Sequence, residues 1–332
     1  MKRKKCLFEK IVDFPNLYRA FRKAFQGSPH RLDAKRFSFY LERELLRLRN
    51  ELTDRTYCPG PFRHYRIFDP KERLISVAPF RDRVVHHAIV KVLEPVYEPV
   101  FIYDSYATRK NKGTHAAIRR VQHFSRGAKF YLKADIRKHF ENMDHGVLCR
   151  ILERKIKDRR CLRLIGRILS GVPWKKGLPI GNLTSQFFAN VYLDPLDHFV
   201  KERLQCKKYV RYMDDMVFLS NSIDSLKKIR TEIDRFLNEK LRLELKREGT
   251  YLNRRSNGIG FLGARIFPGQ LRIKPSCLRR SLHRIEERSR AYREGTIDAN
   301  TYEASLNSIV GHLDFFDSFR LRSAAGHANG WF

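Results

Sequence analysis

The stretch KKYVRYMDDMVFLS, residues 207–220, constrains the fold more than any other part of this sequence. Two adjacent carboxylates, Asp214 and Asp215, stand between two short runs of β-branched, aromatic and other apolar residues. Such flanks predict two strands joined by a tight turn. One interpretation is a hairpin with an acidic turn and no further role, since Asp suits turn backbones and discourages edge pairing. The other is a rigid hairpin tip whose carboxylates bind a divalent metal ion.

The charge of the chain indicates the kind of partner. Its 332 residues carry 68 Lys and Arg against 36 Asp and Glu, a formal net charge of +32. So large an excess repels itself unless a polyanion neutralises it, which favours nucleic acid. A membrane surface is the alternative, but the basic residues are spread along the chain and no run of about eighteen apolar residues occurs. We therefore expect a nucleic-acid partner and no membrane.

Cysteine usage and the N-terminus indicate the compartment. The six cysteines include no CxxC pair, which argues against a zinc site and against a disulfide framework. The opening MKRKKCLFEKIVDF has no apolar region of the kind found in secretory signals. These features predict a cytoplasmic protein.

The remaining chain reads as alternating helices and short strands without a repeat or a long linker. We expect, in the first part of the chain, helices within 16–52, a hairpin of 65–68 and 74–77 turned at Asp69-Pro70, a helix stopping near Pro95 and a strand that ends with Asp135. The second part should contain a long helix with its N-cap within 182–185, a helix after residue 222, a single strand in GIGFLGARIF and basic helices from Pro275 onward.

A third carboxylate strengthens the metal interpretation. Asp135 ends the apolar strand of YLKADI, where a lone Asp is usually a turn residue or a helix cap. Together with Asp214 and Asp215, however, it forms the carboxylate set that a two-metal nucleotidyl-transfer site requires. Lys71 and Arg73, on the predicted hairpin, are either solvated charges or the cations that hold a triphosphate.

The tetrapeptide Tyr212-Met213-Asp214-Asp215 resembles the catalytic box of reverse transcriptases. Further segments resemble that family in the same order along the chain. They are KERLISVAPFRDRVVHHAI, YDSYATRKNKGTHAAI, KADIRKHFENMDH, GLPIGNLTSQFFANVYLDPLDHFV and GIGFLGARI. The resemblance covers residues 64–267, and the basic tail is similar to a thumb.

This resemblance implies an α/β fold, a right-hand polymerase with fingers and palm and an all-helical C-terminal thumb. The implied domains are an N-terminal extension and fingers with the start of the palm (1–130), a palm with the catalytic motifs (131–270) and a helical thumb (271–332). The implied activity is RNA-templated DNA synthesis by an RNA-directed DNA polymerase.

The resemblance also implies a role for individual residues. Asp135, Asp214 and Asp215, with the carbonyl of Ile136, would bind two Mg²⁺ ions, for which Mn²⁺ can substitute. The implied dNTP-binding residues are Lys71, Arg73, Gly181, Gln186 and Phe140, the last as an aromatic gate against a ribose 2′-hydroxyl. Ile180, Tyr212 and Met213 are implied to lie by the template and to affect fidelity.

One branch of the family is especially similar. Group II intron and most bacterial enzymes carry Gln-Gly…Ser-Pro in the palm loop, whereas residues 180–186 read IGNLTSQ, as in diversity-generating retroelements. The branched aliphatic Ile180 cannot hydrogen-bond the nucleotide, and in that branch this goes with misincorporation opposite template adenines. The implied partners are an RNA template, the RNA/DNA heteroduplex, dNTPs and a small basic accessory variability protein, in a bacterial or phage-encoded system.

One position departs from the family, and other functions stay open. Gly249 stands where many members have a lysine that could protonate pyrophosphate, which suggests slow catalysis. Alternatives are a stand-alone bacterial enzyme for phage defence, a group II intron-like enzyme, or a non-catalytic RNA-binding protein on the same fold. An RNA-dependent RNA polymerase is disfavoured by the large side chain of Phe140.

Overall fold

The computed structural model describes residues 3–68, 72–171 and 176–317. Its helices are α1 (Leu7–Val12), α2 (Phe14–Gln26), α3 (Leu32–Phe39), α4 (Leu41–Thr53), α5 (Phe80–Tyr97), α6 (Thr114–Ser125), α7 (His139–Asn142), α8 (His145–Glu153), α9 (Arg159–Ser170), α10 (Leu183–His198), α11 (Ile223–Phe236), α12 (Pro275–Arg293) and α13 (Ala299–Asp314). Its strands are β1 (Arg63–Phe68), β2 (Glu72–Val77), β3 (Phe130–Ala134), β4 (Tyr209–Tyr212), β5 (Asp215–Ser220), β6 (Tyr251–Arg254), β7 (Ile259–Phe261), β8 (Ala264–Ile266) and β9 (Leu271–Ile273). Short π-helical turns, Phe199–Arg203 and Leu237–Leu241, extend α10 and α11.

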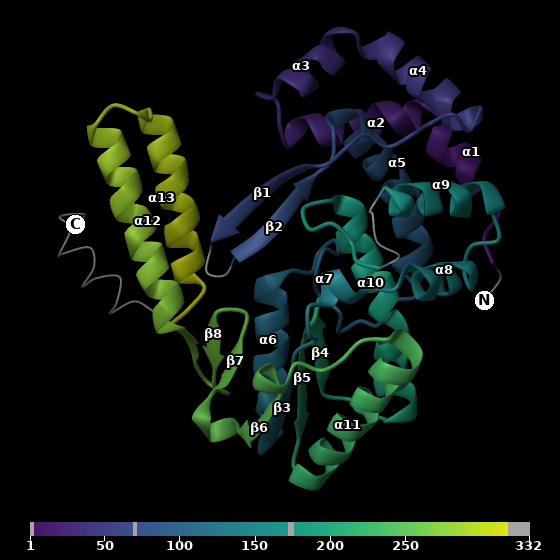
Figure 1. Cartoon of the computed structure of the whole chain (residues 1–332). Coiled ribbons are helices and arrows are strands. Elements are labelled where there is room, and N and C mark those ends of the chain that lie inside the picture. The colour runs from purple at the N-terminus through teal and green to yellow at the C-terminus, as the bar shows by residue number, and fades with distance from the viewer. Residues whose placement is uncertain (1–2, 69–71, 172–175, 318–332) are drawn as a thin grey trace.

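An antiparallel sheet in the order β4-β5-β3-β6, here called the central sheet, lies between α6 and α11 (Figure 1). Side chains alternate between its two faces. Ala134 and Met216 are paired in register and pack into one core together with residues of α5, α10 and α11. Tyr131 and Val217, on the opposite face, join a second core with α6 and the small sheet β7-β8-β9. The hairpin β4–β5 confirms the predicted strands around Asp214.

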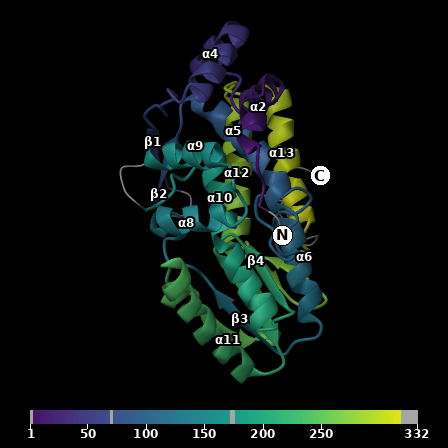
Figure 2. The same ribbon diagram turned by 90° about the vertical axis from the view of Figure 1, so that its right-hand side faces the viewer.

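The N-terminal helices and the first hairpin also agree with the sequence prediction. Helices α2, α3 and α4 occupy most of residues 16–52 and pack beside α5 (Figure 2). The predicted hairpin of 65–68 and 74–77 is present as β1 and β2, with Arg66 opposite Leu74. Its predicted turn residues, Asp69 and Pro70, lie outside the described residues.

Helix α5 ends at Tyr97, which confirms the predicted stop near Pro95, and the buried Val96 and Tyr97 complete its last turn. One predicted strand was wrong. The segment GIGFLGARIF is not one strand but the hairpin β7–β8. Leu262 and Gly263 both have positive φ, 45° and 82°, which is the backbone that a tight two-residue hairpin turn requires.

Helices α12 and α13 form a two-helix arm beside the body of the molecule (Figure 1). Tyr292 and Tyr302 stack at 4.8 Å between ring centroids and hold the two helices together. Leu313 and Phe316 are buried in the second core, so the end of the arm is fastened to α6 and the small sheet. Strand β9 belongs to that small sheet and lies just after the predicted domain boundary at residue 270; the helices begin at Pro275.

Among the helices of the described ranges, none combines the length and the apolar character needed to cross a membrane.

Candidate active site

Three aspartates lie at one end of the central sheet. Asp135 directly follows β3, Asp215 begins β5, and Asp214 lies in the turn between β4 and β5. The antiparallel register pairs Ala134 with Met216, so the next positions, Asp135 and Asp215, lie side by side where the ladder ends. Two strands and one turn therefore bring together carboxylates that are about eighty residues apart in the sequence.

Burial and neighbouring carboxylates raise the pKa values of two of the three aspartates, Asp214 and Asp135. Burial, followed by the charges of Asp135 and Asp215, raises the pKa of Asp214 to about 6, and the cation of Arg73 opposes this rise. Burial and the charge of Asp215 raise the pKa of Asp135 as well. Negative charge at this end of the sheet is thus only partly compensated by the protein.

Lysines supply the compensation that is present. Lys133 Nζ lies 3.2 Å from Asp215 Oδ1, and Lys246 Nζ lies 3.8 Å from Asp135 Oδ2. The pKa of Lys274 is lowered by burial and by the charge of Lys133, against the attraction of Asp215. The acids therefore belong to a mixed-charge cluster with three lysines around it.

The donor set is chemically suited to a divalent cation, since Mg²⁺ and Ca²⁺ prefer carboxylate and carbonyl oxygens. In the described ranges, no group of three or more His, Cys, Asp or Glu side chains converges as a ready-made metal site. The raised pKa values of Asp135 and Asp214 nevertheless mark a place where added positive charge is favourable. The peptide N–H of Ile136 donates to the Asp135 carboxylate. A cation here would replace the contacts that Lys133 and Lys246 now make.

The predicted nucleotide-binding residues lie on two segments that bond to each other. The Ser76 N–H of β2 donates to the Ile180 carbonyl at 2.8 Å, and the Asn182 amide donates to the Ser76 carbonyl at 2.7 Å. Gly181 has φ of 109°, and a Cβ there would lie 2.8 Å from the Ile75 side chain. Glycine is thus required for the close approach to β2, in addition to any approach to a nucleotide.

The hairpin brings one predicted cation to the acids and leaves the other undescribed. Arg73 is exposed on β2, and its charge reaches Asp214. Lys71 lies outside the described residues.

The other predicted site residues are half-buried around the same end of the sheet. The Phe140 carbonyl accepts the Leu178 N–H at 2.7 Å, which links α7 to the loop that leads to Ile180. Gln186 lies in the first turn of α10. Tyr212 accepts a hydrogen bond from the Thr114 hydroxyl at 3.3 Å, and Met213 has a positive φ of 53°.

Two contacts at the site were not predicted from the sequence, although the family resemblance had already marked Gly249 as a departure there. Arg211, inside the apolar flank of the hairpin, is fully buried and paired with the fully buried Asp197 of α10 at 2.6 Å. Gly249 lies against the first acid: a Cβ at this position would be 2.9 Å from Asp135 Cβ and 3.1 Å from Asp135 Oδ2. A charged residue between Val210 and Tyr212 was the available sequence signal for Arg211; nothing local indicated the contact of Gly249.

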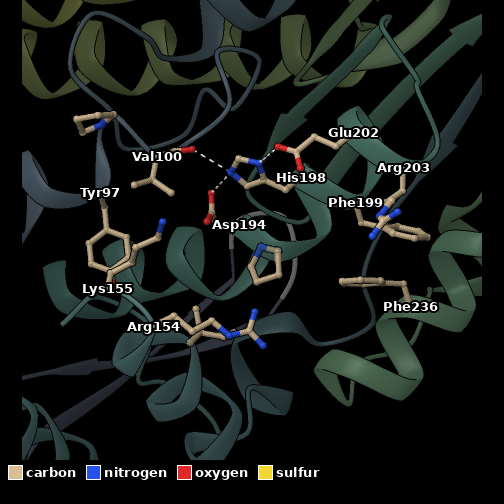
Figure 3. A pocket seen from close by; sticks show the side chains of 13 residues that line it. Tyr97, Val100, Arg154, Lys155, Asp194, His198, Phe199, Glu202, Arg203 and Phe236 are labelled. Carbon is tan, nitrogen blue, oxygen red and sulfur yellow. Dashed lines mark hydrogen bonds and ion pairs between the residues drawn. The ribbon is translucent and has the colours of Figure 1, made fainter. Parts of the chain in front are cut away.

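A separate pocket of about 650 Å³ lies between the ends of α5, α8 and α10 and the side of α11 (Figure 3). His198 lines this pocket and is hydrogen-bonded to Asp194 and Glu202 (Figure 3). The bond to Asp194 raises the pKa of His198 most; burial lowers this pKa, the bond to Glu202 raises it further, and the result is about 10. None of the three aspartates and none of the predicted nucleotide-binding residues lines this pocket. The candidate site is therefore the end of the sheet.

Known proteins share the sequence pattern of this chain. The family described as "Reverse transcriptase (RNA-dependent DNA polymerase)" matches residues 69–266, more than half of the chain and the whole region between the first hairpin and β8. The match includes Asp135, Asp214 and Asp215.

Individual relatives are distant. The group II intron-encoded protein LtrA of Lactococcus lactis subsp. cremoris is 26% identical over 297 residues, covering 68% of this chain and 50% of LtrA. The protein YkfC of Escherichia coli K12 is 27% identical over 273 residues, covering 67% of this chain and 71% of YkfC. The chain thus spans about half the length of LtrA.

Solved structures support the fold. Apo telomerase from Candida tropicalis is similar with a TM-score of 0.50 at 13% identity, over 66% of this chain and 49% of the telomerase chain. The predicted α/β polymerase fold with a helical C-terminal region is confirmed. By sequence pattern, and by the aspartates at the end of its central sheet, this chain belongs to the reverse transcriptase family.

Proposed function

We propose that this protein is an RNA-directed DNA polymerase and that its active site is the end of the sheet that carries Asp135, Asp214 and Asp215. The observation that carries the proposal is the convergence of three half-buried aspartates, two of them with raised pKa values, at one end of the sheet in a chain of the reverse transcriptase family. Buried like charges of this kind are typical of functional sites, because the fold alone gains nothing from them.

The three aspartates, with the Ile136 carbonyl, would hold two Mg²⁺ ions. When bound, such ions lower the pKa of a primer 3′-hydroxyl and stabilise the leaving pyrophosphate. Lys133 and Lys246 would keep Asp215 and Asp135 oriented and partly neutralised until the ions bind. Gly249 lies against Asp135 but has no side chain to offer it a charge. Lys246 provides a cation close to Asp135 instead.

The remaining residues would bind and select the nucleotide. Arg73, with Lys71, would hold the triphosphate, since its charge already reaches Asp214. Phe140 would exclude a 2′-hydroxyl by its ring. Gly181 and Gln186 would contact the nucleotide, and Ile180, Tyr212 and Met213 would face the template pair. The link between Ser76 and Ile180 favours this assignment, because it joins the triphosphate hairpin to the template loop.

We further propose that the protein serves a diversity-generating retroelement, copying a template-repeat RNA into adenine-mutated cDNA with a small basic accessory protein. Ile180, an aliphatic residue at a position where an amide is common, supports this finer function. The similarity to LtrA favours a second candidate, an enzyme of the group II intron type that copies RNA accurately.

The test is extension of a DNA-primed RNA template of defined sequence by the purified protein with Mg²⁺ and dNTPs, followed by sequencing of the products. Asp214→Asn is the control, and Phe140→Ala is assayed with rNTPs. We expect cDNA with errors concentrated at template adenines, no product from Asp214→Asn, and increased rNTP use by Phe140→Ala.

Other results would redirect the proposal. Accurate cDNA would keep the polymerase and favour the group II intron type or a defence enzyme. RNA binding without any product, with cognate RNA and candidate partner supplied, would favour the non-catalytic RNA-binding protein. If Asp214→Asn leaves the RNA function of the protein unchanged, the non-catalytic RNA-binding protein is favoured as well.

A further inference from the structure

The side chain of Arg211 lies on the face of the central sheet opposite to Asp215. Arg211 is paired in register with Met216, and both face the core of α10, whereas the neighbouring pair of Tyr212 and Asp215 faces the other way. Arg211 is therefore directly behind the turn that carries Asp214, and its exposed fraction is 0%.

All five N–H donors of the Arg211 guanidinium are satisfied. Nε donates to Asp197 Oδ1 at 2.8 Å, and Nη2 donates to Asp197 Oδ2 at 2.6 Å and to Ser105 Oγ at 3.1 Å. Nη1 donates to Asn190 Oδ1 at 3.2 Å and to the Met213 carbonyl at 3.1 Å. Five donors in a rigid plane fix the position of every acceptor, which a flexible ammonium group does not do.

The bond to Met213 determines the direction of the next residue. In a trans peptide the carbonyl and the following N–H point in opposite directions, so Arg211 orients the whole peptide between Met213 and Asp214. The N–H of that peptide belongs to Asp214 and faces the Asp214 carboxylate. Met213 has a positive φ of 53°. A non-glycine residue adopts this backbone conformation only when surrounding contacts hold it.

The same guanidinium connects the turn to two other segments. Asp197 and Asn190 lie on α10, the helix that begins at the template loop, and the Asn190 amide donates to the Ala107 carbonyl at 2.8 Å. The Arg211 backbone pairs with residue 105 in an isolated bridge. The turn, α10 and the segment around Ser105 thus share one fully buried hydrogen-bond centre.

We propose that Arg211 is a positioning residue, which orients the Asp214 carboxylate for cation binding through the Met213 carbonyl. The inference rests on the proposed function, because it assumes that Asp214 binds a divalent cation. It assigns to the buried pair of Arg211 and Asp197 a role beyond stability: the two residues transmit the position of α10 to the metal site.

The test is direct Mn²⁺ binding, measured from the electron paramagnetic resonance signal of free Mn²⁺, for the wild type and Arg211→Lys. Lysine keeps the charge and the pairing with Asp197 but cannot bond five acceptors in one plane. Because loss of a group that orients a metal ligand typically weakens metal affinity about 10- to 100-fold, we expect at least about a tenfold rise in the Mn²⁺ dissociation constant. The Mg²⁺ concentration for half-maximal primer extension should rise in parallel.

Tyr209→Phe is the matched control. The Tyr209 hydroxyl donates to Asp197 Oδ1 at 2.8 Å, so its removal damages the same buried network without touching Met213. We expect it to lower the melting temperature and to leave Mn²⁺ affinity within about twofold of the wild type. Arg211→Met combined with Asp197→Leu removes the bond to the Met213 carbonyl without leaving a buried charge unpaired. It serves as the second Arg211 variant if Arg211→Lys does not fold, and a loss of Mn²⁺ affinity larger than that of Tyr209→Phe is expected.

Two outcomes separate the inference from the function on which it rests. If the wild type binds Mn²⁺ and makes cDNA while a folded Arg211 variant binds Mn²⁺ equally well, Arg211 is only a stabilising residue and the inference is wrong. If the wild type shows no binding that depends on Asp214, judged against Asp214→Asn, the proposed metal site itself is wrong.

Discussion

Two acids beside the central sheet are satisfied to very different degrees: Asp197 of α10, behind the sheet, and Asp214, in the turn at its end. Asp197, behind the sheet, receives two hydrogen bonds from Arg211 and one from Tyr209, and the whole group is excluded from water. Asp214, at the end of the sheet, is half-buried, and burial together with the neighbouring carboxylates raises its pKa to about 6. Charges that serve the fold are paired within the fold, whereas charges that serve a ligand stay partly uncompensated until the ligand binds.

We expect the largest loss of stability from a substitution that breaks the buried ion pair of Asp197 and Arg211. Asp197→Asn leaves the Arg211 cation buried without its counter-ion, and removing one partner of a buried pair typically costs about 3–5 kcal/mol. We expect the free energy of unfolding, measured by urea denaturation with circular dichroism, to fall by this amount. Asp224→Asn is the control, because Asp224 pairs with Lys227 on the surface of α11, where ion pairs contribute little. Equal stability of both variants would contradict the comparison.

The opposite change is expected at the uncompensated acid. Asp214→Asn removes a negative charge from a site that disfavours it, so without divalent cations at pH 8 the variant should be more stable than the wild type by about 1–3 kcal/mol. The folded-state pKa is raised, so the penalty is absent below about pH 4, grows as pH rises, and is complete above about pH 6. Urea denaturation at pH 8 and pH 4.5 should show a clearly smaller gain at the lower pH.

A lower stability of Asp214→Asn at pH 8 would mean that the carboxylate is satisfied in the fold. In that case the distinction between the paired Asp197 and the uncompensated Asp214 would not hold. Asp197→Asn provides the comparison in the same assay, since the same substitution at a paired acid has the opposite sign.

The sequence predicted the aspartates of the site, but it did not predict the buried pair of Arg211 and Asp197 behind them. The apolar residues around Asp214 and those before Asp135 form local sequence patterns. Each pattern predicted strands, and the structure contains these strands as β3, β4 and β5. Arg211 is harder to interpret, because its partner Asp197 lies fourteen positions earlier, on a helix whose periodicity gives no sign of the pairing. Only the register of β4 against β5 decides that Arg211 faces the core.

Glycines illustrate the same limit. Gly263 belongs to a turn that a sequence can indicate, yet the predicted single strand missed it because the apolar residues on both sides read as continuous. Gly249 has no local signature at all. Its side-chain position is occupied by Asp135, more than a hundred residues away in the chain, and this contact exists only after β3 and β6 have paired.

The smallest expected effect sharpens the comparison through pH. A cation at the end of the sheet competes with protons for Asp214, so its affinity should be constant above about pH 6 and fall about tenfold per unit below it. The rise in melting temperature caused by a fixed Mg²⁺ concentration should therefore become clearly smaller between pH 6 and pH 5. Asp214→Asn should show little Mg²⁺ effect at any pH, whereas Tyr209→Phe, which alters only the satisfied group, should keep the wild-type profile. A Mg²⁺ effect that persists unchanged at pH 5 would assign the binding to carboxylates other than this one, because only an acid with a raised pKa is neutralised in that interval.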